Sequence, residues 1–228
     1  GANNVAIGQD ALVNNTTAID NTGIGCQAGG GVTTGGYNTL IGYQAGKYNT
    51  ATTTGNFNSI VGVFSYNGSG ATSSEANAFG YNIAGTTGYT TIGVATNDIR
   101  AAHGNVTWAT VSDERYKKDI VDSTAGLSFV NALQPRTFKY KNKGELPDTF
   151  RAYEADSTEV YKNSTTNHGF IAQEVKTAID ADSGIKDGFK LWDDREDGSQ
   201  EVAEAALIPV LVKAIQELSA KVTALENA

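Results

Sequence analysis

A short motif recurs through the first half of the chain: an asparagine, two variable residues, an aliphatic residue and a glycine. Successive motif glycines are 17, 17, 20, 18 and 13 residues apart. Each copy combines β-branched or aliphatic residues with a glycine that tolerates positive φ, which predicts a short strand followed by a turn. The copies are Asn4–Gly8, Asn21–Gly25, Asn38–Gly42 and Asn58–Gly62, with weaker ones at Asn77–Gly80 and Thr90–Gly93.

A single copy of this motif is too small to fold alone. It offers one or two core-facing aliphatic side chains, whose burial does not offset the entropy lost in ordering so much Gly and Asn. The copies must therefore stack on one another, and we expect them to pack against other chains as well. The sequence predicts an all-β repeat fibre of β-roll or β-prism type over residues 1–95, followed by a connector over residues 96–111.

Charge divides the chain into two halves. Only six of the charged side chains lie in residues 1–111, whereas 20 of the 26 glycines do. The net charge of −8 argues against a nucleic-acid partner, because phosphate binding needs a basic surface. No apolar run approaches the roughly 20 residues that cross a membrane, so we predict no membrane insertion. The single cysteine, Cys26, excludes an internal disulfide and a cysteine-based metal cluster.

The Asn-x-x-Ile-Gly units resemble repeats in the heads of trimeric bacterial adhesins and in the shafts and tips of phage tail fibres. This resemblance implies a trimeric fibre. The aromatic residues of the region have two interpretations: a sugar-stacking surface for host recognition, or side chains that fill the fibre core and shield strand edges. We favour the second, because no convergent set of acids lies beside them. The residues are Tyr37, Tyr43, Tyr48, Phe57, Phe64, Tyr66, Phe79, Tyr81 and Tyr89.

Residues 112–202 show the mixed patterns of an α+β domain. Leu127, Val130 and Leu133 are spaced by three and predict a short helix, which Pro135 stops. Alternation over residues 137–140 predicts a strand.

Longer polar stretches in this domain predict loops and arms. We expect an exposed loop over residues 141–145, a protruding hairpin or arm over 148–166, and a solvated loop or second arm over 182–200. Residues 169–175 pass from a strand-like start into a helix that carries Val175 and Ile179 on one side.

Apolar residues near the C-terminus follow an unbroken heptad pattern, which predicts a coiled-coil helix over residues 203–228. β-branched residues at a and leucine at d favour two parallel strands, but a coil beside a trimeric fibre favours three, and we predict three. The alternative is an ordinary amphipathic helix on a globular core. The seam is Ile208, Leu211, Ile215, Leu218, Val222 and Leu225.

The junction between the halves carries candidate chemistry at residues 112–117. Ser112 suits a helix N-cap, which is the simpler interpretation. A lysine five residues later suggests a second one, because serine attacks a carbonyl when a neighbouring neutral amine takes its proton. Arg115 and Lys118 would supply positive charge that favours the neutral amine of Lys117.

Several motifs in this half, in this order, resemble the intramolecular chaperone domains classed as peptidase S74, found at the C-termini of phage tailspikes, tail fibres and neck appendages. The matching elements are SDERYKKDI at residues 112–120, LQP at 133–135 with FKY at 138–140, GFIAQEV at 169–175, and the terminal heptads.

The resemblance implies a domain that trimerises the fibre, holds its strands in register during folding, and then removes itself by cleavage between Val111 and Ser112. Ser112 would be the nucleophile and Lys117 the general base of a self-cleaving serine endopeptidase. It would act in a single turnover, either in cis or between the chains of the trimer. We assign only supporting roles, namely orienting the site or starting a helix, to Asp113, Glu114 and Arg115. By the same resemblance the mature part belongs to the virion and contacts a host receptor or glycan, after folding and cleavage in the host cytoplasm.

Other chemistry is not predicted. We expect no cofactor and no metal, because His103 and His168 are isolated and no phosphate-cradling glycine loop with a lysine is present. A carbohydrate-degrading spike lacks a visible acid pair in the repeat region. The alternative function is a non-cleaving structural adhesin or receptor-binding tip in which Ser112 only caps a helix.

Overall fold

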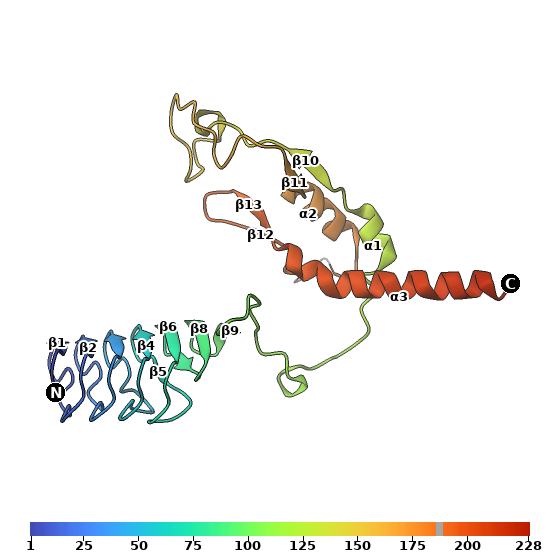
Figure 1. Cartoon of the computed structure of the whole chain (residues 1–228). Helices are drawn as coiled ribbons and strands as arrows, with labels where there is room; N and C mark the ends of the chain where they lie inside the picture. Colours follow the sequence, from blue (N-terminus) through green and yellow to red (C-terminus); the bar gives the residue numbers. More distant parts are fainter. Residues whose placement is uncertain (186–188) are drawn as a thin grey trace. The chain divides into compact units, whose positions relative to one another are not determined.

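The computed structural model describes residues 1–185 and 189–228, which form two compact units. Unit 1 comprises residues 1–118 and unit 2 residues 119–228 (Figure 1). The solvated loop expected over residues 182–200 includes residues 186–188, which lie outside the described part.

Unit 1 is a solenoid built on one seven-stranded sheet with the order β1-β2-β3-β4-β6-β8-β9. Its strands are parallel except for β9, which pairs antiparallel with β8. This confirms the strand-and-turn interpretation, and β9 extends the sheet into the segment expected to be a connector. The strands are β1 (Val5–Ile7), β2 (Thr22–Ile24), β3 (Thr39–Ile41), β4 (Ser59–Val61), β6 (Asn77–Tyr81), β8 (Tyr89–Val94) and β9 (Asn97–Ala102), with β5 (Tyr66–Asn67) and β7 (Ala84–Gly85) forming a separate parallel pair.

The core of unit 1 is narrow because a strand that contributes to it sends inward only the residue that lies two before the motif glycine. In β3, β4 and β6 this residue is Leu40, Ile60 or Ala78, each fully buried. The aliphatic residue next to the motif glycine points to the other face, as strand alternation requires. None of the nine aromatic residues of the region is buried, so they do not fill the core of the solenoid. The other part of that expectation, that they shield strand edges, stays a prediction.

The motif asparagines form a buried amide ladder along the solenoid. Asn38 Nδ2 donates to Asn21 Oδ1 at 3.0 Å and to the Gly55 carbonyl at 2.9 Å. Asn38 Oδ1 accepts from the backbone N–H of Asn58 at 3.0 Å and from its Nδ2 at 2.9 Å. Asn4 and Asn21 are joined in the same way. Each internal amide is thus satisfied while it links one turn of the solenoid to the next.

The motif glycines are required by close packing between turns. Gly25 and Gly42 have φ of +126° and +123°, and a Cβ at either would lie 2.7 Å from the carbonyl oxygen of the next motif glycine. A side chain at these positions would therefore combine backbone strain with a clash.

The fifth copy of the motif is shifted by one residue from the expected alignment. Asn77 pairs with Ser59, so Ala76 occupies the asparagine position, and its N–H donates to Asn58 Oδ1 at 3.0 Å. Asn67 donates to the same oxygen at 3.4 Å. The amide ladder therefore ends at Asn58.

Unit 2 has an α+β composition around one apolar core. Strand β10 (Arg136–Phe138) pairs antiparallel with β11 (Asn167–Gly169), and β12 (Trp192–Asp194) with β13 (Gln200–Val202). The helices are α1 (Leu127–Ala132), α2 (Ala172–Ala181) and α3 (Leu207–Glu226), with short 3₁₀ turns η2 (Lys143–Glu145) and η3 (Glu204–Ala206). The buried core is Ala125, Phe129, Leu133, Val175, Ala178, Ile179, Leu191, Leu207 and Val210.

Several expectations for unit 2 need correction. Phe129, not Leu127, is the buried centre of α1. The expected solvated loop over residues 182–200 contains the β12–β13 hairpin, because Leu191 is fully buried and anchors it. The predicted helix with Val175 and Ile179 on its buried side is confirmed as α2.

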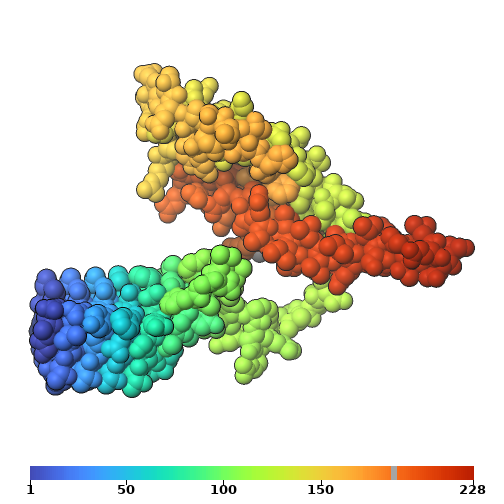
Figure 2. All heavy atoms as spheres, in the orientation of Figure 1, coloured from blue at the N-terminus to red at the C-terminus, as the bar shows by residue number. Residues whose placement is uncertain are grey.

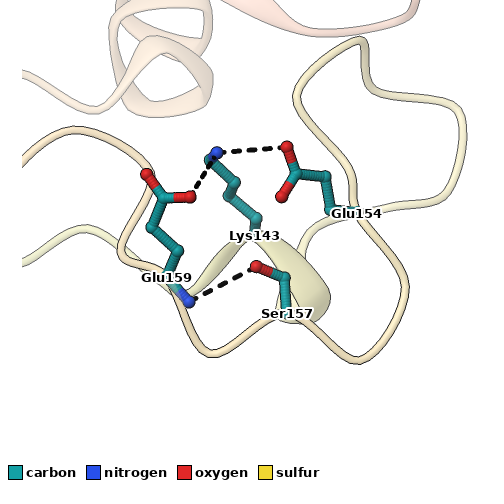
Figure 3. Close-up of polar contacts among 4 residues, drawn as sticks. All are labelled: Lys143, Glu154, Ser157 and Glu159. Carbon is teal, nitrogen blue, oxygen red and sulfur yellow. Dashed lines mark hydrogen bonds and ion pairs between the residues drawn. The ribbon is translucent and has the colours of Figure 1, made fainter.

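The chain between β10 and β11 forms the protruding arm (Figure 1). Its expected exposed loop is partly wrong, because Lys143 lies in η2 and inserts between two acidic residues. Lys143 Nζ donates to Glu159 at 2.7 Å and to Glu154 at 3.1 Å (Figure 3). These two hydrogen bonds raise the pKa of Lys143, and the hydrogen bond to Glu159 has the larger effect.

Helix α3 has two apolar faces. Leu207, Val210 and Ala214 are buried against the rest of unit 2. The heptad seam lies on another face, and its six residues are 42–77% exposed. The C-terminal part of α3 projects beyond the body of its unit (Figure 2). No helix in the described ranges is long and apolar enough to span a membrane.

Substituting Asn38 by leucine tests the amide ladder. The change leaves the Gly55 carbonyl and the Asn58 N–H without their buried partners, so we expect unit 1 to lose about 2 kcal/mol or more of stability. Amide hydrogen exchange of Leu40 and Ile60 measures it. Asn97→Ala at an exposed strand end is the control and should change little; equal protection in both variants would contradict the ladder's importance.

Candidate functional site

The junction segment forms one short 3₁₀ turn, η1 (Glu114–Tyr116), and Asp113 is its N-cap. The Asp113 carboxylate accepts from the Arg115 N–H at 2.8 Å. The simpler interpretation of Ser112 as the helix cap is therefore wrong, because the neighbouring carboxylate takes that position. The helix-start role expected for Asp113 is observed.

The Ser112 hydroxyl lies beside the amine of Lys117. Nζ donates to Oγ at 2.8 Å, a distance at which a proton can pass between them. Lys117 is held extended after η1, where its N–H donates to the Glu114 carbonyl at 2.8 Å. The η1 turn thus reverses the chain direction enough to bring the side chains of Ser112 and Lys117 together.

Charge at the junction is partly neutralised. The Arg115 guanidinium donates to Asp113 from Nε at 2.9 Å and from Nη2 at 2.7 Å. This pairing lowers the pKa of Asp113 and raises that of Arg115. Arg115 therefore does not act as the uncompensated positive charge that we expected beside Lys117.

Every residue from Val111 to Ile120 except Asp113 is exposed. Apolar side chains share this exposure, with Tyr116 at 81%, Ile120 at 63% and Val111 at 60%. In the single chain the serine and lysine are hydrogen-bonded but solvated.

Unit 2 contains an open groove of about 1210 Å³ between the arm and the β12–β13 hairpin. Three aromatic rings line it: the Tyr140 ring lies 5.4 Å from that of Phe138 and 5.7 Å from that of Tyr161. Its hairpin side is mostly acidic, with Asp194, Glu196, Asp197 and Glu201.

Asp197 connects the hairpin to the arm. It accepts from Ser199 Oγ at 2.6 Å and from the Arg151 N–H, on the arm, at 3.0 Å. These hydrogen bonds lower the pKa of Asp197 to about 2, and the hydrogen bond from the Ser199 side chain has the largest effect.

Glu217 is a contact that sequence reasoning missed. Its carboxylate on α3 accepts from the Leu127 N–H, the start of α1, at 2.9 Å. A Cβ at Gly126 would lie 2.5 Å from the same carboxylate, so a side chain there would require Glu217 to shift. The only signal in the sequence was a glycine before an apolar helix.

These features define a class of protein: a repeat-built β-solenoid joined to a small α+β domain that ends in a long helix with an exposed apolar seam. Residues 112–183, about a third of the chain, match the family described as chaperone of endosialidase, Peptidase_S74. The match begins at Ser112, and it supports a C-terminal intramolecular chaperone domain. It does not include the repeats. No curated protein and no solved structure matches the chain significantly.

The matched family suggests a coarse function. It associates the chain with the chaperone domains of phage tail fibres and tailspikes, and it is a peptidase family with self-cleaving members.

Acid should loosen the link between arm and hairpin. Asp197 has a folded-state pKa of about 2, below its ordinary value of about 3.9. The stability it contributes is therefore present above pH of about 4 and is lost as pH falls towards 2. The amide chemical shift of Arg151, followed by NMR, should move with a midpoint near the lower value, and Asp197→Asn should abolish the transition. A midpoint near 4 would show that the hydrogen bonds are not held.

Proposed function

We propose that this chain is the C-terminal part of a phage tail fibre or tailspike, whose chaperone domain drives homotrimerisation and then releases itself by cutting between Val111 and Ser112. The observation that carries the proposal is the 2.8 Å hydrogen bond between Lys117 Nζ and Ser112 Oγ at the start of the family match. The proposed parts are the fibre segment 1–95, the connector 96–111, the chaperone domain 112–202 and the coiled-coil helix 203–228.

The proposed reaction uses only groups of the chain and water. Lys117 takes the hydroxyl proton as Ser112 Oγ attacks the carbonyl carbon of Val111. The tetrahedral intermediate collapses when Lys117 returns the proton to the departing amine of Ser112, which leaves an ester between the Val111 carbonyl and Oγ. Water then hydrolyses the ester, releasing a Val111 carboxylate and restoring the serine hydroxyl.

Solvent exposure of the pair bears on when cleavage occurs. A lysine acts as a base only as the neutral amine, and desolvation favours that form. In the single chain the pair is exposed and Arg115 is paired with Asp113. We infer that assembly buries the junction, with the exposed Tyr116 and Ile120 as its apolar contacts, so that cleavage follows folding.

The exposed seam of α3 supports trimerisation. A helix whose heptad seam remains solvated while another face is buried in its own unit presents that seam to other chains. Three seams in a parallel coil bring three fibre segments together before the segments contact one another, which lowers the entropy cost of assembling them. Cleavage then removes the device that aids reassembly, and the fibre persists because unfolding is slow.

The mature fibre would contact the host through residues 1–111, as part of the virion. Its exposed rings offer one candidate surface for a glycan: Tyr37 and Phe57 stack with centroids 5.1 Å apart and are about half exposed. Folding and cleavage would take place in the host cytoplasm.

The Ser112–Lys117 pair is tested by substitution. The folded full chain should yield two fragments separated at Val111. We expect Ser112→Ala to abolish cleavage and Lys117→Ala to slow it by roughly 100-fold or more, because the general base is lost. Mass spectrometry of the denatured protein measures both.

Lys141→Ala is the matched control, because it removes an exposed lysine that has no role in the proposed reaction, and this variant should still cleave. An intact chain of 23.9 kDa in the unaltered protein under all conditions would favour the structural adhesin instead. Unchanged cleavage in both Ser112→Ala and Lys117→Ala would remove the pair from the mechanism.

Charge placed on the seam tests the trimer. Ile215→Asp puts a carboxylate at an a position, where burial in a coil is costly, so we expect a monomer at low micromolar concentration. Val212→Asp changes a half-exposed residue of the same helix off the seam and should remain trimeric. Light scattering coupled to size-exclusion chromatography gives the mass. A trimer for Ile215→Asp would contradict the seam assignment.

A further inference from the structure

The outer face of the unit 1 sheet carries a continuous apolar row. In each parallel strand the residue before the motif glycine lies in register with its counterpart in the next strand. Each of these side chains follows the residue two before the motif glycine and therefore points to the opposite face of the sheet, and none belongs to the core of the solenoid. The row is Ile7, Ile24, Ile41, Val61, Phe79 and Ile92.

The row continues onto β9, which is outside the repeat and runs antiparallel. Ile99 is the direct partner of Ile92 across the two strands, so both side chains lie on the same face. All seven strands of the sheet therefore contribute an apolar residue to one line, although the last strand does not share the motif.

Solvent reaches this row in the single chain. Its ends are the most exposed, with Ile7 at 58%, Ile92 at 42% and Ile99 at 44%. The residues between these ends are half-buried: Ile24, Ile41, Val61 and Phe79. The neighbouring column on the same face consists largely of short polar side chains, such as Thr22, Thr39 and Ser59. Because these side chains are short, they do not prevent another protein surface from contacting the apolar row. Long apolar stripes on folded proteins mark interaction surfaces.

We propose that this face is the surface through which unit 1 packs against the same face of other copies of this chain. The inference rests on the proposed homotrimer and adds which face of the fibre segment is internal. A partner that covers the whole row must offer an apolar group at every strand spacing of about 4.8 Å. A second copy of the solenoid, parallel and in the same register, presents such a series.

Charge and continuity favour the same occupant. Neither the row nor the adjacent column contains a charged residue, so identical faces meet without repulsion. The seam of α3 is a second exposed apolar line in the same chain, and the heptads predict parallel association. Parallel copies joined at α3 would thus bring like rows together.

Thiol labelling tests the proposal in the full chain. In a Cys26→Ser background, Ile7→Cys and Ile92→Cys place thiols on the row, and Val13→Cys, at a residue 56% exposed off the row, is the matched control. We expect a maleimide to label both row positions at least about tenfold more slowly than position 13, because the assembled interface must open first.

Light scattering on the same samples separates the outcomes. Row thiols that react as fast as the control in a trimeric chain would overturn the interface and leave the proposed function standing. A monomeric chain would overturn both the homotrimer and this interface. Slow labelling of the row beside fast labelling of the control, in a trimer, supports the proposal.

Discussion

Unit 1 depends on the buried amide ladder that runs from Asn4 to Asn58. Its core consists of small and medium aliphatic side chains, and each turn of the solenoid contributes few of them. The asparagines add to this core a set of hydrogen bonds that join successive turns and satisfy backbone groups at the corner before each strand. Stability is thus repeated along the chain, turn by turn, as in other solenoids.

Unit 2 is organised differently, around one core to which α3 contributes a single face. The other face of α3 and the Ser112–Lys117 pair share a property: both are formed in the single chain and both are solvated. A seam and a serine–lysine pair each gain their full effect only when water is removed. The proposed trimerisation and cleavage are therefore linked by one physical requirement, which is burial by other chains.

Three features could be predicted because each depends on residues close together in the sequence. They are the strand-and-turn repeats, the division of the chain into two halves, and the proximity of Ser112 to Lys117. The orientation of side chains could not be predicted. A three-residue strand buries its middle residue or its two ends, and only the register decides which, so the motif isoleucine proved to face outward. The β12–β13 hairpin was predicted as a solvated loop because its sequence is rich in acidic residues. Only the structure shows that Leu191, next to the hairpin, is fully buried. Asp113 replaced Ser112 as cap because of local backbone angles.

The unequal lengths of the repeats have a consequence for variation. Motif glycines are separated by 17 residues in two places and by 20 in another, yet β2, β3 and β4 pair without a break. The additional residues between Gly42 and Gly62 are accommodated outside the strands. Insertions and deletions can therefore alter the lateral surface of the solenoid while its axial rise stays constant, so surface diversity and fibre length can evolve independently.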